Sequence, residues 1–266
     1  MSPAPEPATT ERTRPATVPR QVLGVEVLLV LGVSLGASAV YSLVGIVGRL
    51  TAGTALAEQS ATLNASAAPG RPWLDLAYQL LGILFALVPA LLALHLLNRT
   101  DPPAFRTIGL DLREWPADLG RGAALAALIG IPGLGLYLAS HALGVNATVV
   151  PAALPHVWWA IPVLVLSAVQ NALLEEVVVV GYLLRRLGQL GLPPWMGVGV
   201  SAVLRGSYHL YQGFGGFVGN LVMGIVFGAA YRRWGRVAPL AVAHTLLDVV
   251  AFVGYAVLRG RVSWLP

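Results

Sequence analysis

The chain has no cysteine and no lysine, and only 11% of its 266 residues are charged. Without cysteine, a disulfide framework, a thiolate metal site and a cysteine nucleophile are all excluded. A typical soluble domain has about 25% charged residues, so this composition, with 56% hydrophobic residues, favours one polytopic membrane domain. The sequence also lacks a Gly-x-Ser-x-Gly elbow and a His-Glu-x-x-His pair, which excludes the familiar signatures of serine hydrolases and soluble zinc proteases.

Long apolar runs dominate what is present, and a spanning helix needs roughly 20 such residues. They predict an all-α, polytopic membrane helix bundle with about seven transmembrane helices. The fifth and sixth runs are short and are separated near residues 213–216, and residues 50–71 and 144–155 are predicted as loops. Glu26 is interpreted as lying at headgroup level. The runs cover residues 21–48, 72–98, 122–143, 156–184, 195–212, 217–231 and 237–258.

The arginines give the chain an orientation. With seven crossings and a cytoplasmic N-terminus, the inner segments hold Arg12, Arg14, Arg20, Arg99, Arg106, Arg113, Arg121, Arg185, Arg186, Arg232, Arg233 and Arg236. The outer segments hold Arg49, Arg71, Arg259 and Arg261. This asymmetry is the one that the positive-inside rule describes. The asymmetry predicts an integral membrane protein, placed in a bacterial plasma membrane. The placement of the arginines beside the lipid bilayer explains the net charge of +5, and no nucleic-acid partner is expected.

Three segments divide the chain, although no internal repeat and no second folded domain is found. Residues 1–20, rich in Pro, Thr and Arg, are predicted to be a disordered cytoplasmic tail. A signal peptide is the competing interpretation, but the first apolar run is longer than an h-region of 7–15 residues. Residues 21–155 are predicted to hold the N-terminal transmembrane helices and loops, and residues 156–258 the catalytic core.

Glu175 and Glu176 are the most informative residues because they lie inside an apolar run. A charged side chain at the bilayer centre costs about 2.5–3.5 kcal/mol on insertion scales, so it is a functional candidate. From the helix rise they lie roughly 15 Å inside the inner boundary at Arg185 and Arg186. Adjacent helical residues point about 100° apart, so one glutamate is expected to face a chamber and the other a neighbouring helix.

His209, His244, Asp248 and Arg205 are the other polar residues embedded in later apolar runs. By the same rise His244 lies roughly 12 Å, Asp248 roughly 18 Å and His209 roughly 21 Å into the membrane. His244 and Asp248 share a helical face because they are four residues apart. Groups from three helices are therefore predicted to meet in one layer. Asn171, Tyr208 and Tyr211 are interpreted mainly as packing residues.

Carboxylates and imidazoles in an apolar chamber suit the activation of water. A glutamate can act as a general base, and histidines can polarise the water or stabilise an oxyanion. They can also hold zinc, which lowers the pKa of a bound water to about 7. Zinc is therefore a possible cofactor, with a metal-independent mechanism equally open. The candidate metal ligands are Glu175, His209, His244 and Asp248.

Three motifs in this order, Glu175-Glu176, Arg205-Gly-Ser-Tyr-His209 and His244-Thr-Leu-Leu-Asp248, resemble the CPBP family. These intramembrane proteases are related to the CaaX prenyl protease and to bacteriocin-processing proteins. The resemblance covers about residues 156–258 and implies that Glu175 is the water-activating base and Glu176 its supporting carboxylate. It also implies that His209 and His244 hold or polarise the water, with Asp248 at the family's Asn/Asp position.

Two positions depart from the family pattern. Val180 stands where the family has arginine, and Arg205 stands where it has an aromatic residue. We expect Arg205, four residues before His209 and on the same helical face, to replace the missing arginine and to pair with Glu176. A competing interpretation is that loss of the arginine marks weakened or absent proteolysis.

The predicted function is an intramembrane endopeptidase that hydrolyses membrane-associated peptides or proteins with water activated by Glu175. Two alternatives stay open. One is a non-catalytic membrane scaffold or immunity factor of protease descent. The other is a proton-coupled transporter, which lacks the internal repeat that many transporters show.

Overall fold

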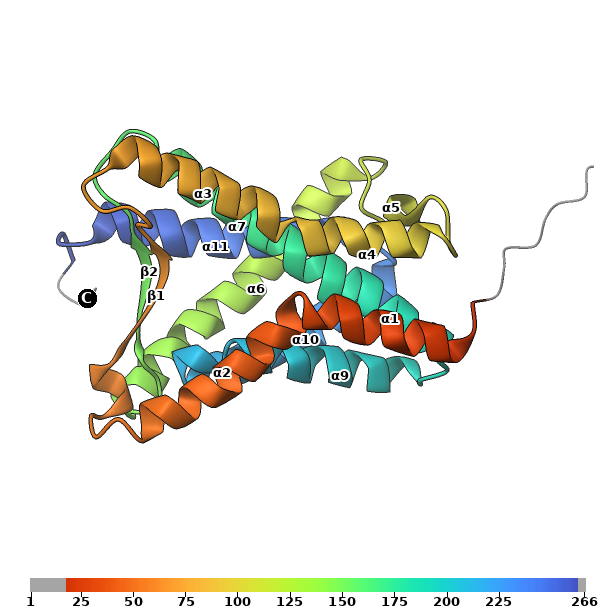
Figure 1. Cartoon of the computed structure of the whole chain (residues 1–266), viewed down its shortest axis with the longest axis horizontal. Helices are drawn as coiled ribbons and strands as arrows, with labels where there is room; N and C mark the ends of the chain where they lie inside the picture. The colour runs from red at the N-terminus through yellow and green to blue at the C-terminus, as the bar shows by residue number, and fades with distance from the viewer. Residues whose placement is uncertain (1–17, 263–266) are drawn as a thin grey trace, which may run out of the picture.

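The computed structural model describes residues 18–262 as a helix bundle with one small sheet (Figure 1). The predicted tail, residues 1–20, therefore lies outside the described residues except for its last three positions. The elements in chain order are α1 (Arg20–Gly32), α2 (Leu35–Leu50), η1 (Leu56–Glu58), β1 (Ser60–Ala65), α3 (Pro72–Ala86), α4 (Val88–Asn98), α5 (Ala104–Thr107), α6 (Trp115–Ala142), β2 (Thr148–Ala153), α7 (Ala160–Glu175), η2 (Glu176–Tyr182), α8 (Leu183–Gln189), α9 (Pro194–Tyr208), η3 (Leu210–Gln212), α10 (Phe214–Trp234) and α11 (Ala238–Leu258).

Five helical segments among the described residues are long and apolar enough to cross a membrane, namely Pro72–Asn98, Trp115–Ala142, Ala160–Gln189, Phe214–Trp234 and Ala238–Leu258. α1 and α2 give a sixth if they form one span, bent by 56°. The predicted all-α membrane bundle is thus confirmed. The run predicted at 195–212 instead forms α9, of 15 residues, and the short η3. The break predicted near residue 213 is present, where Gly213 has φ +116°, a conformation that favours glycine.

The two ends of the described chain lie at opposite ends of the bundle, because α1 begins at one end and α11 finishes at the other (Figure 1). α11 packs against α6 and α7, while α10 packs against α9 and α2 lies along α9. If the helix axes cross the bilayer, the termini face opposite sides. The cytoplasmic location of the N-terminus stays a prediction from the arginines.

A π-helical segment, η2, continues α7 and lies at the centre of the fold. Val177, Val178 and Val179 are each at most 1% exposed and pack against residues of α1, α2 and α4. β-Branched side chains are stiff and crowd a regular helix, and π-helical turns occur often at functional sites. The two glutamates stand where the α-helix gives way to this wider turn.

Two arginines that were predicted to mark the inner boundary are buried instead. Arg186 is 0% exposed because it forms an internal ion pair, 2.7 Å from Nε to Glu26 Oε1. Its other nitrogens donate to Thr100 and Gln189 and to a main-chain oxygen. Glu26 thus neutralises Arg186 inside the bundle and also accepts from Tyr182 Oη, while its level in the bilayer stays a prediction.

Arg236, before α11, is 5% exposed and joins that helix to the segment before α6. Its guanidinium lies 2.6 Å from Asp118 and 3.2 Å from Asp111. Hydrogen bonds from Arg113, and then from Arg236, lower the pKa of Asp111 to about 2. These ion pairs connect the start of α11 to α6 and to the segment before it.

The segments predicted as loops at 50–71 and 144–155 contain the two strands, and in this respect the loop prediction is wrong. β1 and β2 pair in parallel, with Thr62 opposite Val150 and Asn64 opposite Ala152. Neither strand shows a strict alternation of apolar and polar residues, which is the usual sequence signal for a half-buried strand. The sheet crosses one end of the bundle between α2 and α3 (Figure 1).

Candidate active site

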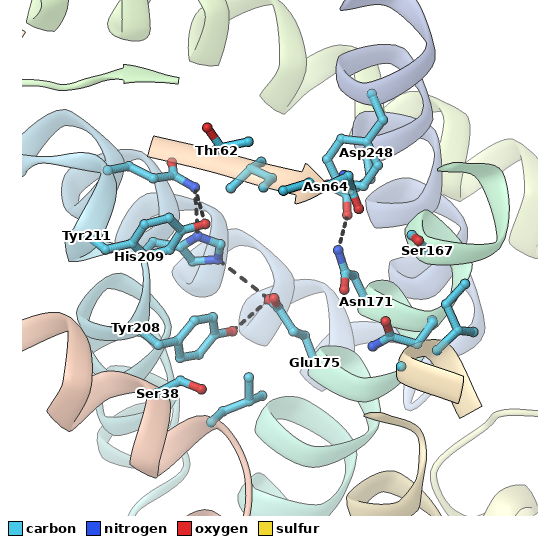
Figure 2. Close-up of a pocket in the computed structure, with 18 of the residues that line it drawn as sticks. Ser38, Thr62, Asn64, Ser167, Asn171, Glu175, Tyr208, His209, Tyr211 and Asp248 are labelled. Carbon is cyan, nitrogen blue, oxygen red and sulfur yellow. Dashed lines mark hydrogen bonds and ion pairs between the residues drawn. The ribbon is translucent and has the colours of Figure 1, made fainter. Parts of the chain in front are cut away.

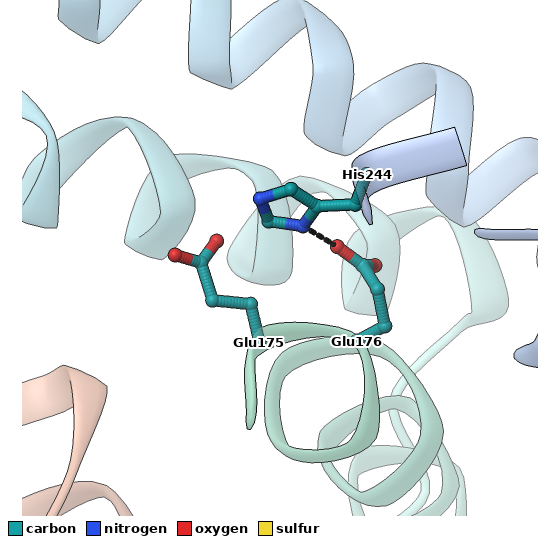
Figure 3. A group of neighbouring side chains, drawn as sticks. All are labelled: Glu175, Glu176 and His244. Atoms are coloured by element: carbon teal, nitrogen blue, oxygen red, sulfur yellow. Dashed lines mark hydrogen bonds and ion pairs between the residues drawn. The ribbon is translucent and has the colours of Figure 1, made fainter. Parts of the chain in front are cut away.

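Glu175 and Glu176 point in different directions from the junction of α7 and η2, as Figure 3 shows. Glu175 is 8% exposed and lines a cavity, whereas Glu176 is 0% exposed and does not. The division expected from the helical angle is therefore present in the structure. Glu175 faces open space, and Glu176 faces neighbouring helices.

Glu176 joins three helices through one oxygen. Its Oε1 accepts a hydrogen bond from Arg205 Nη2 at 2.7 Å, and His244 Nδ1 lies 2.7 Å from the same atom. A hydrogen bond between Nδ1 and Glu176 engages this ring nitrogen. This leaves Nε2 of His244 on the side of the cavity.

Arg205, on α9, connects the two glutamates. Its side chain is 0% exposed, and its Nη1 donates to Glu175 Oε2 at 3.2 Å. The guanidinium also lies over the Phe227 ring, 5.5 Å from the centroid. A Cβ on Gly224 would lie 3.4 Å from Arg205 Cδ and 2.7 Å from the Ala202 main chain, so a glycine there allows α10 to approach this part of α9. The expected pair of Arg205 with Glu176 is formed.

Glu175 has three polar neighbours around the same oxygen, Oε2, and Figure 2 shows two of them, Tyr208 and His209. Tyr208 Oη donates to it at 2.7 Å, Arg205 Nη1 is the second donor, and His209 Nε2 lies 3.7 Å away. His209 Nε2 is buried and has no hydrogen-bond partner among the described residues. Since Gln212 Nε2 lies 3.4 Å from Nδ1 of this ring, Nε2 is the ring atom left for a ligand.

Asp248 lies across the cavity from His209. Its Oδ2 is 3.8 Å from His244 Nε2, which is too long for a hydrogen bond. The same oxygen accepts a hydrogen bond from Asn171 at 3.2 Å. The Asp248 side chain is 20% exposed, so this carboxylate remains open to the cavity.

The cavity has a volume of about 800 Å³. Four of the six predicted site residues line it, namely Glu175, His209, His244 and Asp248. Arg205 and Glu176 lie behind them in the protein interior. The fold therefore brings all six residues into one connected group. Four of them line the cavity, and the other two contact Glu175 and His244 from the protein interior.

Sequence reasoning missed several residues of this site. Tyr208 is the closest partner of Glu175, and Asn171 is a partner of Asp248, so their interpretation as packing residues is wrong. Asn171 lies one helical turn before Glu175, and that spacing was a usable signal. Ser38 and Ser42 of α2 also line the cavity, and no motif in the first run indicated them.

One compact group could hold a metal ion among the described residues. Glu175, Glu176 and His244 each offer a ligand atom, all within 4.8 Å of one another. His209 and Asp248, two of the four predicted ligands, are not part of this group. Glu176 Oε1 already accepts from Arg205 and His244, so a cation would have to displace those hydrogen bonds.

The apolar helices and the buried acid–imidazole cluster define a polytopic membrane protein with an enclosed polar site. Residues 157–250 match the family model described as "Type II CAAX prenyl endopeptidase Rce1-like", and this segment contains all six predicted site residues. The predicted resemblance to CaaX-type proteases is confirmed for this segment. No curated protein and no solved structure matches the chain.

Proposed function

We propose that this protein is an intramembrane endopeptidase in which Glu175 activates a water to hydrolyse a peptide bond. The observation that carries the proposal is the position of Glu175. It lines a cavity inside a membrane bundle, and its Oε2 is held by Tyr208 and Arg205. Its Oε1 makes no hydrogen bond among the described residues and is left for a water. The match to a protease-type family supports the same reaction.

The reaction begins with proton transfer from water to Glu175 Oε1 while the water oxygen forms a bond to the substrate carbonyl carbon. The carbonyl oxygen gains the negative charge. His209 Nε2, which has no hydrogen-bond partner among the described residues, donates to this oxyanion. The tetrahedral intermediate then collapses, the C–N bond breaks, and the proton on Glu175 moves to the leaving nitrogen. General base catalysis is worth about 10²–10⁴-fold in rate, and one oxyanion donor about 10²–10³-fold.

The other site residues position these groups. Glu176 holds the ring of His244 through Nδ1, which directs Nε2 toward the water. Arg205 balances the charge of Glu176, its nearest carboxylate. Asp248, held by Asn171, offers an acceptor for the substrate amide at the other wall of the cavity.

A zinc ion fits this arrangement less well than a metal-independent reaction does. The guanidinium of Arg205 lies 3.2 Å from Glu175 and 2.7 Å from Glu176, and its positive charge repels a divalent cation at the same carboxylates. His244 Nδ1 is engaged with Glu176 and is not free to bind metal. Activity is therefore expected to survive removal of divalent metals.

The test is cleavage of membrane-associated peptides by purified protein in proteoliposomes, with fragments identified by mass spectrometry. Hydrolysis in H₂¹⁸O must place one heavy oxygen in the new carboxyl group. We expect Glu175→Gln to abolish cleavage, with Glu58→Gln, an exposed glutamate outside the cavity, as the matched control. Chelator should leave the rate unchanged.

Each other result has a defined meaning. Cleavage that persists in Glu175→Gln removes the proposed base. Folded wild-type protein that cleaves no member of a broad peptide panel argues for the scaffold alternative. Loss of activity in chelator that zinc restores would replace the metal-independent reaction with a metal-dependent one.

A further inference from the structure

β1 forms part of the cavity wall. Thr62, Leu63, Asn64 and Ala65 all line the cavity, and no residue of β2 does. β1 therefore stands between β2 and the open space that holds Glu175. Figure 2 shows Thr62 and Asn64 on this strand, on the side of the site between His209 and Asp248.

The pairing with β2 leaves one edge of β1 free. Thr148 N donates to Gln59 O, and the register continues in steps of two. The main-chain groups of residues 59, 61, 63 and 65 therefore point toward β2, because alternate residues of a parallel strand face the same partner. Those of Thr62 and Asn64 point to the other edge, toward the cavity.

A side chain closes one end of this free edge, where Ser60 O accepts from Arg49. No hydrogen bond to the free-edge N–H and C=O groups of Thr62 and Asn64 is found within residues 18–262. Thr62 is exposed and Asn64 is half-buried, and unpaired main-chain groups at a sheet edge are a ready template for pairing with another chain. A ligand with its own main chain would satisfy them.

We propose that the substrate binds as an extended strand that adds to the free edge of β1, which places its scissile peptide against Glu175. This inference rests on the proposed function and adds the substrate class: unfolded or locally unwound segments, not intact helices. Addition of a strand to a sheet edge derives its affinity from main-chain hydrogen bonds and its specificity from alternate side chains. The carbonyls of an intact helix are already bonded within the helix, so they cannot pair with β1.

The cavity also has an entrance on the outer surface of the bundle. Tyr41 of α2 is 80% exposed and Tyr78 of α3 is 52% exposed, yet both line the cavity. The cavity therefore reaches the outside between α2 and α3. A membrane-associated segment can enter here sideways, with β1 directly at the inner end of its path.

Thr62→Pro is the decisive variant because it removes one free-edge N–H and spares the bonds to β2. Proline is tolerated on edge strands where the N–H faces away from the ladder. Thr62→Val, which keeps the N–H and the β-branched shape, is the matched control. We expect Thr62→Pro to lower kcat/KM about two- to twelvefold relative to Thr62→Val, as for one lost hydrogen bond. Equal kcat/KM in the two folded variants would overturn the proposal.

A second measurement leaves the enzyme untouched. Amide bonds of a cleaved peptide are replaced one at a time by esters, each of which deletes one N–H donor. Strand addition predicts that kcat/KM falls at every second position near the cleavage site, and an effect without this period overturns it even if Thr62→Pro does not fold. If wild-type protein cleaves nothing, the proposed function fails first. If it cleaves with no period of two, only the strand inference fails.

Discussion

Replacement of Arg205 by alanine should be the most damaging single change in this protein outside Glu175 itself. The guanidinium is 0% exposed and lies 2.7 Å from Glu176 and 3.2 Å from Glu175. Without it, two buried carboxylates share a space whose remaining close donors are Tyr208 and His244. Removing one partner of a buried ion pair typically costs about 3–5 kcal/mol. This corresponds to about two to almost four orders of magnitude in the ratio of folded to unfolded protein.

The assay compares thermal unfolding in detergent with cleavage per folded molecule. Arg113→Ala is the matched control, because this arginine is 62% exposed in its pair with Asp111 and such surface pairs are worth about 0–1 kcal/mol. Arg205→Ala should unfold at much lower temperature than the control and lose cleavage even where it is folded. Full retention of both properties would refute the role assigned to the pair.

Val180→Arg gives a second arm to this experiment. Val180 is fully buried beside Met223 and Phe227, at the position where the CPBP pattern has arginine. Alone, the substitution places a second positive charge in an apolar cluster and should destabilise the protein. In the Arg205→Ala background it should restore part of the lost stability. If the double variant is worse than either single variant, the idea that the arginine has moved between helices is wrong.

Two further predictions concern the partners of Glu175 and the buried pair behind the site. Tyr208→Phe deletes the donor to Glu175 Oε2 and should lower kcat about 10- to 100-fold with little change in KM, as for a hydrogen bond to a charged group. Tyr231→Phe is the control. An unchanged kcat in Tyr208→Phe, or an equal loss in the control, contradicts the prediction. Glu26→Gln leaves Arg186 without its counter-charge and should destabilise the protein by about 3–5 kcal/mol. Unfolding curves measure this loss, and cleavage rates per folded molecule should stay unchanged. An unshifted unfolding midpoint would rule the prediction out.

The site could be anticipated from the sequence because its signals are local. Charges within apolar runs are rare enough to draw attention one by one. The angle between adjacent helical residues separates the roles of Glu175 and Glu176, and the four-residue spacing aligns His244 with Asp248. Depth along each helix follows from the rise per residue. None of these inferences needs knowledge of which helices are neighbours.

The parts that could not be anticipated depend on contacts between distant segments. Glu26 and Arg186 are 160 positions apart, and nothing near either residue indicates the other. The same holds for β1 and β2, whose pairing depends on residues 60–65 meeting residues 148–153. Seven spans were expected because residues 195–212 are mostly apolar, but hydropathy alone did not show that α9 would end at Tyr208 and bring His209 to the cavity.

The shortness of α9 has a consequence for the surrounding lipid. Fifteen helical residues rise about 22 Å, whereas the hydrocarbon core of a bilayer is about 30 Å thick. Trp195 and Val203 are 61% and 52% exposed on this helix, so its outer side is apolar and uncovered by the rest of the described chain. A short apolar helix is accommodated by a local decrease in bilayer thickness. If α9 crosses the bilayer, the headgroups and their hydration would be drawn inward on this flank, toward the cavity that Tyr208 lines.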